Sequence, residues 1–502
     1  MKQARVTAVA MSMLVFGTGC RTDLTGINTN PNSPTSAPPG ALFTGAVNSA
    51  VTRFNGSAST LSMAALFAQH VAQVQYVEED RGHIASATIN GLNTGAYSGE
   101  LQDLQKVRQA GVAKDAASLW GPATVMQSWV FQNLTDLWGD IPYSEALQGD
   151  VPGGSLAPAY DPQEAIYAGV LKSLAEASAA MKIVPSTQVG LGTADLVYRG
   201  DLGKWQRLAN TLRARMALRM LRRDPAKGTA ELAAALTAGL LTGNGDNAAV
   251  VWPGDGVFDN PLSRTFATRD DHRVSKSLLD TMLTLRDPRV RIYAQPTRAD
   301  PTRYAGLQNG LDNATVSPFF NTTSRPGTIF YPGATSYGVI GTTAGRRTPS
   351  YIATYAEAAF IMAEAAERGI GASGNSASFY NAAVTASILQ WGGTAAEAQA
   401  YLAQPGVAYA GGATGLQQIG LQKWIALYTQ SIEAWSEWRR TGNPASIRMG
   451  PRAYSDVREV PRRILYPSNE QSVNATNLAA AISRQGPDTY STRMWWDKVA
   501  SP

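Results

Sequence analysis

Apolar residues recur every three or four positions along most of this chain, and this spacing constrains its fold more than any other feature. Regular polar–apolar alternation, which would indicate strands, is weak throughout. The pattern therefore predicts an all-α fold of paired antiparallel helices, although no strict 34-residue repeat is present. Pro122 is expected at a helix start and Asp201 at a helix cap. The stretches expected to be helical are 98–114, 122–139, 162–181, 201–220, 351–368, 376–389, 395–402, 416–438 and 471–482.

One long segment breaks the helical pattern. Residues 243–350 are rich in Gly, Pro, Asn, Thr and aromatic residues, with a single helix expected near 275–285. Long irregular segments are uncommon inside a domain and usually carry function. We therefore expect a loop-rich insertion that bears the ligand face.

Composition excludes several classes of protein. The net charge is +5 over 502 residues, and no dense run of Lys or Arg is present, which argues against a nucleic-acid partner. A single Cys cannot form a thiolate metal cluster. Three His at scattered positions offer few candidates for the histidine of a Ser/His or Cys/His hydrolase. Neither a cofactor nor a catalytic metal is expected.

The N-terminus predicts export and a lipid anchor. Lys2 and Arg5 precede an apolar run that ends in small residues and Cys20, the only cysteine. We expect residues 1–19 to be a signal peptide, Cys20 to be lipidated, and residues 20–40 to form a tether. Gly17 departs from the usual lipidation motif, so an ordinary signal peptide with an incidental cysteine is the alternative. No other apolar run is long enough to span a membrane.

Several acidic residues are candidates for chemistry. Asp136 and Asp140 are four apart beside Trp138, so they could act as general acid and base on a sugar. Alternatively, Asp140 braces the turn that ends a helix. Residues 78–80 could hold Ca²⁺ or form a solvated loop, and the same choice applies to residues 270–271.

Aromatic residues fall into two groups. Those at helical spacing between Trp424 and Trp438 are interpreted as a core stripe, and Trp495 and Trp496 as packing residues. Aromatics in loops suit a ligand face, because sugars stack on rings while polar side chains bind hydroxyl groups. The alternative is that each ring packs its loop onto the helices. The candidate ligand-binding residues are Tyr76, Tyr97, Trp252, Tyr304, Phe319, Tyr331 and Tyr337, with Phe320 beside them.

Several blocks, in order along the chain, resemble the SusD/RagB family of outer-membrane lipoproteins. They include DLTGINTNPNSPTSAPPGALF after Cys20, LWGDIPYSEAL (137–147) and YDPQEAIYAGVLKSLAEA (160–177). Further blocks are DLVYRGDLGKWQRLANTLRARMALRM (195–220), RVSKSLLDTMLTLRDPRV (273–290), EAWSEWRRTGNP (433–444), VPRRILYPSNEQSVN (460–474) and MWWD (494–497). Together they span nearly the whole mature chain.

The resemblance implies tetratricopeptide-like helix pairs in a single domain, residues 41–502. It also implies a non-enzymatic lipoprotein, anchored to the outer membrane at the cell surface, that binds a nutrient such as a glycan and delivers it to a SusC-like TonB-dependent β-barrel transporter. A ligand site made from loops near 76–97 and 252–337 is implied as well. A peptide-binding member of the family and a lipid-anchored all-α glycan hydrolase using Asp136 and Asp140 are the alternatives.

Overall fold

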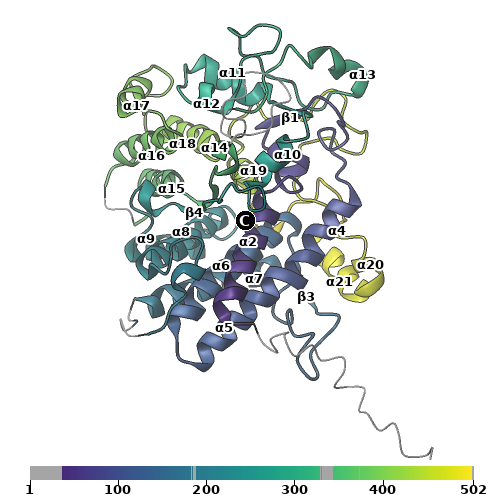
Figure 1. Ribbon diagram of the computed structural model, residues 1–502, viewed down its shortest axis with the longest axis vertical. Helices are drawn as coiled ribbons and strands as arrows, with labels where there is room; N and C mark the ends of the chain where they lie inside the picture. Colours follow the sequence, from purple (N-terminus) through teal and green to yellow (C-terminus); the bar gives the residue numbers. More distant parts are fainter. Residues whose placement is uncertain are drawn as a thin grey trace, which may run out of the picture. The chain divides into compact units, whose positions relative to one another are not determined.

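Helices carry most of the chain in the computed structural model, which describes residues 37–182, 184, 188–327, 330, 343–371 and 374–499. The longer helices in Figure 1 are α2 (Pro39–Asn55), α4 (Ser86–Gly95), α5 (Gln102–Ala113), α6 (Ala117–Trp138), α7 (Gln163–Met181), α8 (Leu202–Met220), α9 (Pro225–Ala238), α10 (Pro261–Phe266), α11 (Lys276–Thr284), α15 (Tyr355–Glu367), α16 (Ser376–Gln390), α17 (Ala395–Leu402), α18 (Gly412–Ala426), α19 (Ser431–Thr441) and α21 (Ala475–Gln485).

Shorter helical turns join these elements. They are η1 (Thr60–Ala64), α3 (Ala65–Phe67), η2 (Ala96–Leu101), η3 (Gly192–Ala194), η4 (Asn244–Asp246), α12 (Val290–Tyr293), α13 (Asn313–Val316), η5 (Ser317–Phe319), α14 (Thr343–Arg346), α20 (Glu470–Val473) and η6 (Trp495–Asp497). Among the described residues, no helix is both long and apolar enough to cross a membrane.

Consecutive helices pack side by side, as the periodicity predicts. Each helix from α5 to α8 packs on the next one, and α15 packs on α16 and α18 in the second half of the chain. Because α6 lies between α5 and α7, residues on nearly all its sides are buried. The all-α fold is therefore confirmed, with only short strands added.

The helix ends follow local sequence signals, with one exception. Asp201 caps α8 by accepting a hydrogen bond from the Lys204 backbone N–H at 3.0 Å, as expected. Helix α6 ends where Gly139 adopts a φ of 87°, a conformation that favours glycine. The expectation for Pro122 is wrong, because this residue lies inside α6, which begins at Ala117.

Three short antiparallel sheets of two strands each lie among the described residues, and two of them include strands of the loop-rich segment. β1 (Val71–Gln73) pairs with β5 (His272–Val274), β2 (Ile141–Pro142) with β3 (Tyr160–Asp161), and β4 (Ala248–Val250) with β6 (Ser350–Ala353). The helix expected near 275–285 is α11, and other short helices interrupt the same segment. The first of these sheets matters most for the site, because it brings residues 71–73 against residues 272–274.

Candidate functional site

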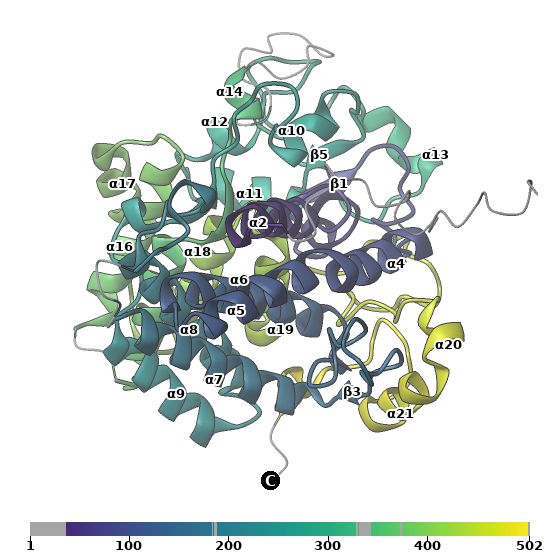
Figure 2. The ribbon, with the colours of Figure 1, turned by 60° about the horizontal axis from the view of Figure 1, so that its bottom comes forward.

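The pairing of β1 with β5 brings two distant loop stretches together. Val71 lies opposite Val274 and Gln73 opposite His272, and the Val74 N–H extends the pairing to the Asp271 carbonyl at 2.7 Å. Figure 2 shows the two strands side by side below α10. We call the surface formed by residues 74–80, 269–273 and 307–320 the loop face.

Asp80 connects residues 74–80 of the loop face to residues 307–320 through hydrogen bonds. Its carboxylate accepts hydrogen bonds from the Asn309 side chain at 2.7 Å and from the backbone N–H groups of Gly310 at 3.0 Å and Gln73 at 3.2 Å. Burial raises the pKa of Asp80 to about 7, against the opposing effect of these donors. The Asp80 carboxyl group therefore holds the loop that carries Tyr76 against residues 309–310.

A small apolar cluster lies beneath the loop face. Its buried members come from both stretches and are Ala72, Val74, Val77, Leu307, Leu311 and Val316, with Phe320 packed against them. Between the buried Val74 and Val77, Gln75 and Tyr76 are exposed. The loop is therefore anchored from below and directs Tyr76 outward.

Tyr76 is the most exposed aromatic residue that the structure describes. It is 61% exposed, and its backbone φ of 54° lies in the left-handed region, where a bulky residue is strained. The Arg269 guanidinium carbon lies 5.0 Å from the centroid of its ring. Arg269 is held in turn by the Asp271 carboxylate at 2.5 Å. An exposed ring thus has a fixed cationic neighbour.

A second arginine orders the neighbouring loop. Arg273 is fully buried and donates to the Phe320 carbonyl at 2.8 Å and to the Asp270 carboxylate at 3.0 Å. Arg325 reaches the same carboxylate at 2.8 Å. Asp270 therefore pairs with Arg273 and Arg325, as Asp271 pairs with Arg269. Both carboxylates are thus engaged by arginines within the fold.

The other predicted aromatics fall in different places. Phe319, which is 39% exposed, lies on the loop face with Tyr76, whereas Tyr304 is partly buried against the main core. Trp252 does not meet the expectation of a ligand-facing ring: it is 4% exposed and donates its indole N–H to the Ser350 hydroxyl at 2.9 Å. Tyr331, Tyr337 and Cys20 lie outside the described residues.

Tyr97 lines a separate cavity of about 600 Å³. Its hydroxyl donates to the Pro142 carbonyl at 2.6 Å, and its ring packs edge-on against Phe131. Burial, and then the charges of Glu470 and Asp161, raise the pKa of this hydroxyl well above its usual range, so it remains a donor. Tyr76 and Tyr97, which are predicted to share one ligand surface, thus lie in two different places.

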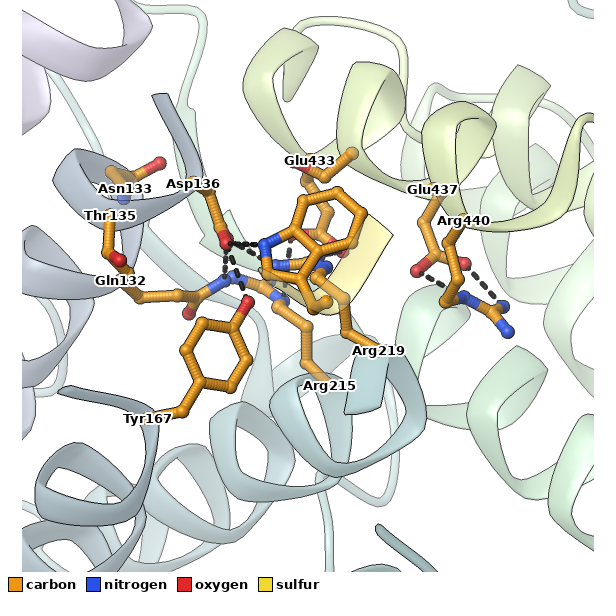
Figure 3. Close-up of polar contacts among 12 residues, drawn as sticks. Gln132, Asn133, Thr135, Asp136, Tyr167, Arg215, Arg219, Glu433, Glu437 and Arg440 are labelled. Atoms are coloured by element: carbon orange, nitrogen blue, oxygen red, sulfur yellow. Dashed lines mark hydrogen bonds and ion pairs between the residues drawn. The ribbon is translucent and has the colours of Figure 1, made fainter. Parts of the chain in front are cut away.

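Asp136 belongs to a buried network and has no open surface for a substrate. It is 1% exposed, pairs with Arg219, and accepts hydrogen bonds from the Tyr167 hydroxyl at 2.6 Å and the Trp496 indole at 3.0 Å. Figure 3 shows Arg219 between Asp136 and Glu433, with which it also pairs at 2.5 Å. Burial raises the pKa of Asp136, and the Arg219 charge opposes that shift.

Asp140 also has a structural role. One carboxylate oxygen accepts the Gln163 backbone N–H at the start of α7 at 2.8 Å, and the other accepts from Arg484 at 2.7 Å. The bracing interpretation of Asp140 is therefore the one the contacts favour. With both carboxylates committed, the pair cannot serve as acid and base on a sugar.

The acidic run at 78–80 does not gather into a metal site. Within the described ranges, no group of three or more His, Cys, Asp or Glu side chains is placed to hold a metal ion. Asp80 faces inward toward backbone donors, while Glu78 is exposed and Glu79 accepts from the Gln73 side chain at 2.9 Å. The solvated-loop interpretation fits Glu78.

Comparisons with known proteins place the chain in a family. The SusD-like family model, described as "starch-binding associating with outer membrane", matches residues 31–467. A solved structure described as a chitin-binding protein is 29% identical, with a TM-score of 0.78, and the match covers 92% of this chain and 100% of the other. No curated protein matches significantly.

More distant structures share the fold. A chitin-binding SusD homologue from Flavobacterium johnsoniae is 24% identical, with a TM-score of 0.78 and coverage of 92% of this chain and 99% of the other. A SusD homologue from Bacteroides uniformis is 23% identical, with a TM-score of 0.77 and coverage of 91% and 99%.

In the described residues, a helical scaffold carries the ordered loop face, and Asp136 and Asp140 are committed to contacts within the fold. The chain belongs to the SusD-like family of outer-membrane nutrient-binding proteins, which are non-catalytic.

Proposed function

We propose that this protein binds a glycan on the loop face, with Tyr76 as the stacking ring, and delivers it to a SusC-like TonB-dependent transporter. The observation that carries the proposal is the placement of Tyr76. A bulky side chain is held in a strained backbone conformation and exposed to solvent, which is common at functional sites and unfavourable elsewhere.

The surroundings of Tyr76 suit a sugar. A pyranose ring presents a C–H face that stacks on an aromatic ring, while its hydroxyl groups need donors and acceptors at the edge. Arg269 supplies fixed donors beside the ring, and Gln75 and Glu78 are exposed on the same loop. The brace at Asp80 keeps this arrangement in place before the ligand arrives, which reduces the entropy lost on binding.

A β-linked N-acetylglucosamine oligosaccharide is the ligand we favour. The 29% identical relative is described as a chitin-binding protein, and the match covers nearly the whole of both chains. Such an oligosaccharide is flat and neutral, so it can lie along an exposed ring without requiring a cluster of opposite charge.

We also propose that Cys20 carries the lipid that holds the protein at the outer membrane. The support is its position as the only cysteine, directly after the apolar part of the signal sequence. Residues 20–40 then form a tether between the lipid and the helical body, which lets the loop face stay near the transporter.

Calorimetric titration with chitotetraose tests the glycan site. Tyr76→Ala should weaken binding at the loop face roughly five- to a hundredfold, because one stacking ring contributes about 1–3 kcal/mol by analogy with base–aromatic stacking. Tyr76→Phe is the matched control, since it keeps the ring, and it should bind nearly as well as the wild type. Equal binding by all three proteins would show that Tyr76 is not the platform.

A further inference from the structure

Three separate segments of the chain form the walls of the cavity beside Tyr97, and hydrogen bonds join these segments to one another. The segments are residues 93–102 of α4, η2 and α5, the loop 142–158, and residues 469–474 around α20. Asn469 donates to Thr94 at 2.9 Å, Gln102 to Asp150 at 2.9 Å, and Asn474 to the Pro158 carbonyl at 2.8 Å.

The cavity has an aromatic wall and an apolar rim. Tyr97 is fixed at its hydroxyl by Pro142, so its ring has one orientation. Leu156 is 85% exposed and Val473 66% exposed, and both line the opening. Exposed aliphatic side chains around a hollow of about 600 Å³ mark a place where a ligand is covered on binding.

Two amide side chains in the lining have unused hydrogen-bonding groups. Asn93 is 7% exposed and makes no side-chain hydrogen bond within the described part of the chain. The Oδ1 atom of Asn469 is buried and has no donor among the described residues. Leaving such groups unpaired is unfavourable, so both suit contacts to a ligand that carries N–H and O–H groups.

The charge of the lining selects against anions. Asp150 and Glu470 are both in the wall, and Glu470 accepts from the Tyr160 hydroxyl at 2.8 Å. Lys106 is the cation near Asp150, at 4.0 Å. The remaining polar lining is made of neutral amides and hydroxyls, which are Asn93, Thr94, Ser98, Gln102, Ser155, Asn469 and Asn474.

We propose that this cavity is a second oligosaccharide-binding site, which takes the end of a neutral acetamido sugar chain and works independently of Tyr76. A sugar ring would stack on Tyr97, and its amide and hydroxyl groups would pair with Asn93 and Asn469. The choice of sugar class rests on the proposed function. The site itself rests on the cavity, which shares no lining residue with the loop face.

Two variants test this site, one by filling the cavity and one by removing a hydrogen-bonding side chain. Gly149→Trp fills the opening: Gly149 is exposed, and a Cβ there would meet only Leu156, at 3.5 Å. Gly245→Trp is its control, since Gly245 is also exposed and a Cβ there has open space, away from the cavity. Asn93→Ala removes one amide and should weaken this site roughly two- to tenfold, as loss of a single hydrogen bond does.

The test is the number of chitotetraose molecules bound per chain, measured by ligand-observed NMR titration of the full-length protein in detergent. The wild type and Gly245→Trp should bind two, whereas Gly149→Trp and Tyr76→Ala should each retain one site of wild-type affinity, the other site being filled in Gly149→Trp and weakened in Tyr76→Ala. Two sites remaining in Gly149→Trp, or complete loss of binding in Tyr76→Ala, would overturn the second site. So would absence of binding by the wild type up to the solubility limit of the sugar.

The outcome separates this inference from the proposed function. If Gly149→Trp loses a site and Tyr76→Ala loses none, the cavity binds the sugar and the proposed role of Tyr76 fails. If only Tyr76→Ala loses a site, the loop face stands and the cavity inference fails. Circular dichroism of each variant confirms that the loss of a site does not follow from unfolding.

Discussion

Asp80 accepts a hydrogen bond from the Asn309 side-chain amide at 2.7 Å, and the two residues are 229 positions apart in the chain. Asn309 also donates to the Val71 carbonyl at 2.8 Å. One amide therefore joins the start of β1, the loop that carries Tyr76 and the segment before α13. The order of the loop face depends on this contact.

Asn309→Ala should lower the free energy of unfolding by about 1–3 kcal/mol, because it leaves buried acceptors on Asp80 and Val71 without a donor. Loosening of the loop should also weaken glycan binding, although Asn309 is not expected to touch the ligand. Chemical denaturation and calorimetry measure the two effects. Asn381→Ala, at an exposed position of α16 outside the loop face, is the control and should change neither.

Asp136→Asn should lower the free energy of unfolding by about 3–5 kcal/mol, since it removes a charge that pairs with the buried Arg219. Asp280→Asn removes an exposed carboxylate from a pair within one helix and should change stability by less than about 1 kcal/mol. Denaturant titration measures both values. A small effect of Asp136→Asn, together with loss of a glycan-cleaving activity, would revive the hydrolase interpretation.

Trp435→Ala should lower stability, whereas Tyr76→Ala should weaken glycan binding. The Trp435 ring is fully buried, lies 5.1 Å from Phe67 and donates to the Pro461 carbonyl at 2.8 Å. Its removal should lower stability by about 3–5 kcal/mol through a core cavity. Tyr76→Ala should leave the melting temperature nearly unchanged, because the exposed Tyr76 ring buries little area in the fold. Thermal unfolding of both variants provides the comparison.

Acid should destabilise the protein through two histidines near the loop face. Burial lowers the pKa of both His70 and His272 to about 4, whereas an unfolded histidine titrates near 6.5. Between these values the unfolded chain binds more protons at each histidine, so the contribution of the two histidines to stability falls as the pH decreases from about 6.5 to about 4. Each histidine should contribute on the order of 3 kcal/mol to this loss. Asp80, whose pKa burial raises to about 7, contributes with the opposite sign over the same range.

His272→Gln checks the origin of the acid effect. The His272 ring nitrogen Nε2 lies 3.0 Å from the Leu61 carbonyl, and a glutamine amide can donate to the same oxygen without titrating. The variant should lose the contribution of one histidine, on the order of 3 kcal/mol, from the pH dependence measured by denaturation between pH 6.5 and 4. If stability depends on pH in the variant as it does in the wild type, His272 does not contribute to the acid sensitivity.

Cys20→Ala should move the protein from the membrane fraction to the soluble fraction, because the proposed lipid anchors it in the bilayer. Fractionation of cells expressing each form, followed by immunoblotting, measures the shift. Retention of Cys20→Ala in the outer membrane at the wild-type level would contradict lipid anchoring through this residue.

Helices could be predicted from the sequence because their signals are local. The stretch 395–402 is α17 to the residue, and Asp201 caps α8. Where contacts between distant segments determine the secondary structure, the predicted helix boundaries are wrong. Residues 350–353 form β6 because β4 pairs with them, and the stretch 416–438 contains two helices, α18 and α19. Thr429, with a φ of 76°, lies in the break between them.

The site could be predicted only in part, for the same reason. Tyr76 is identifiable as an aromatic in a loop, and the two stretches do meet, but strands of three residues carry no periodicity that would reveal the pairing of β1 with β5. Arg269 and Asn309 were missed because only the fold brings them to Tyr76 and Asp80. Trp252 was misplaced because a buried ring and an exposed ring in a loop look alike in sequence.

A crystal structure of the protein with chitotetraose tests the central claim most directly. The account predicts a sugar ring stacked on Tyr76, with the Arg269 guanidinium bonded to its hydroxyl or acetamido oxygens. A complex in which the sugar is bound elsewhere and the Tyr76 ring remains open to solvent would contradict the assignment of the loop face as the glycan site.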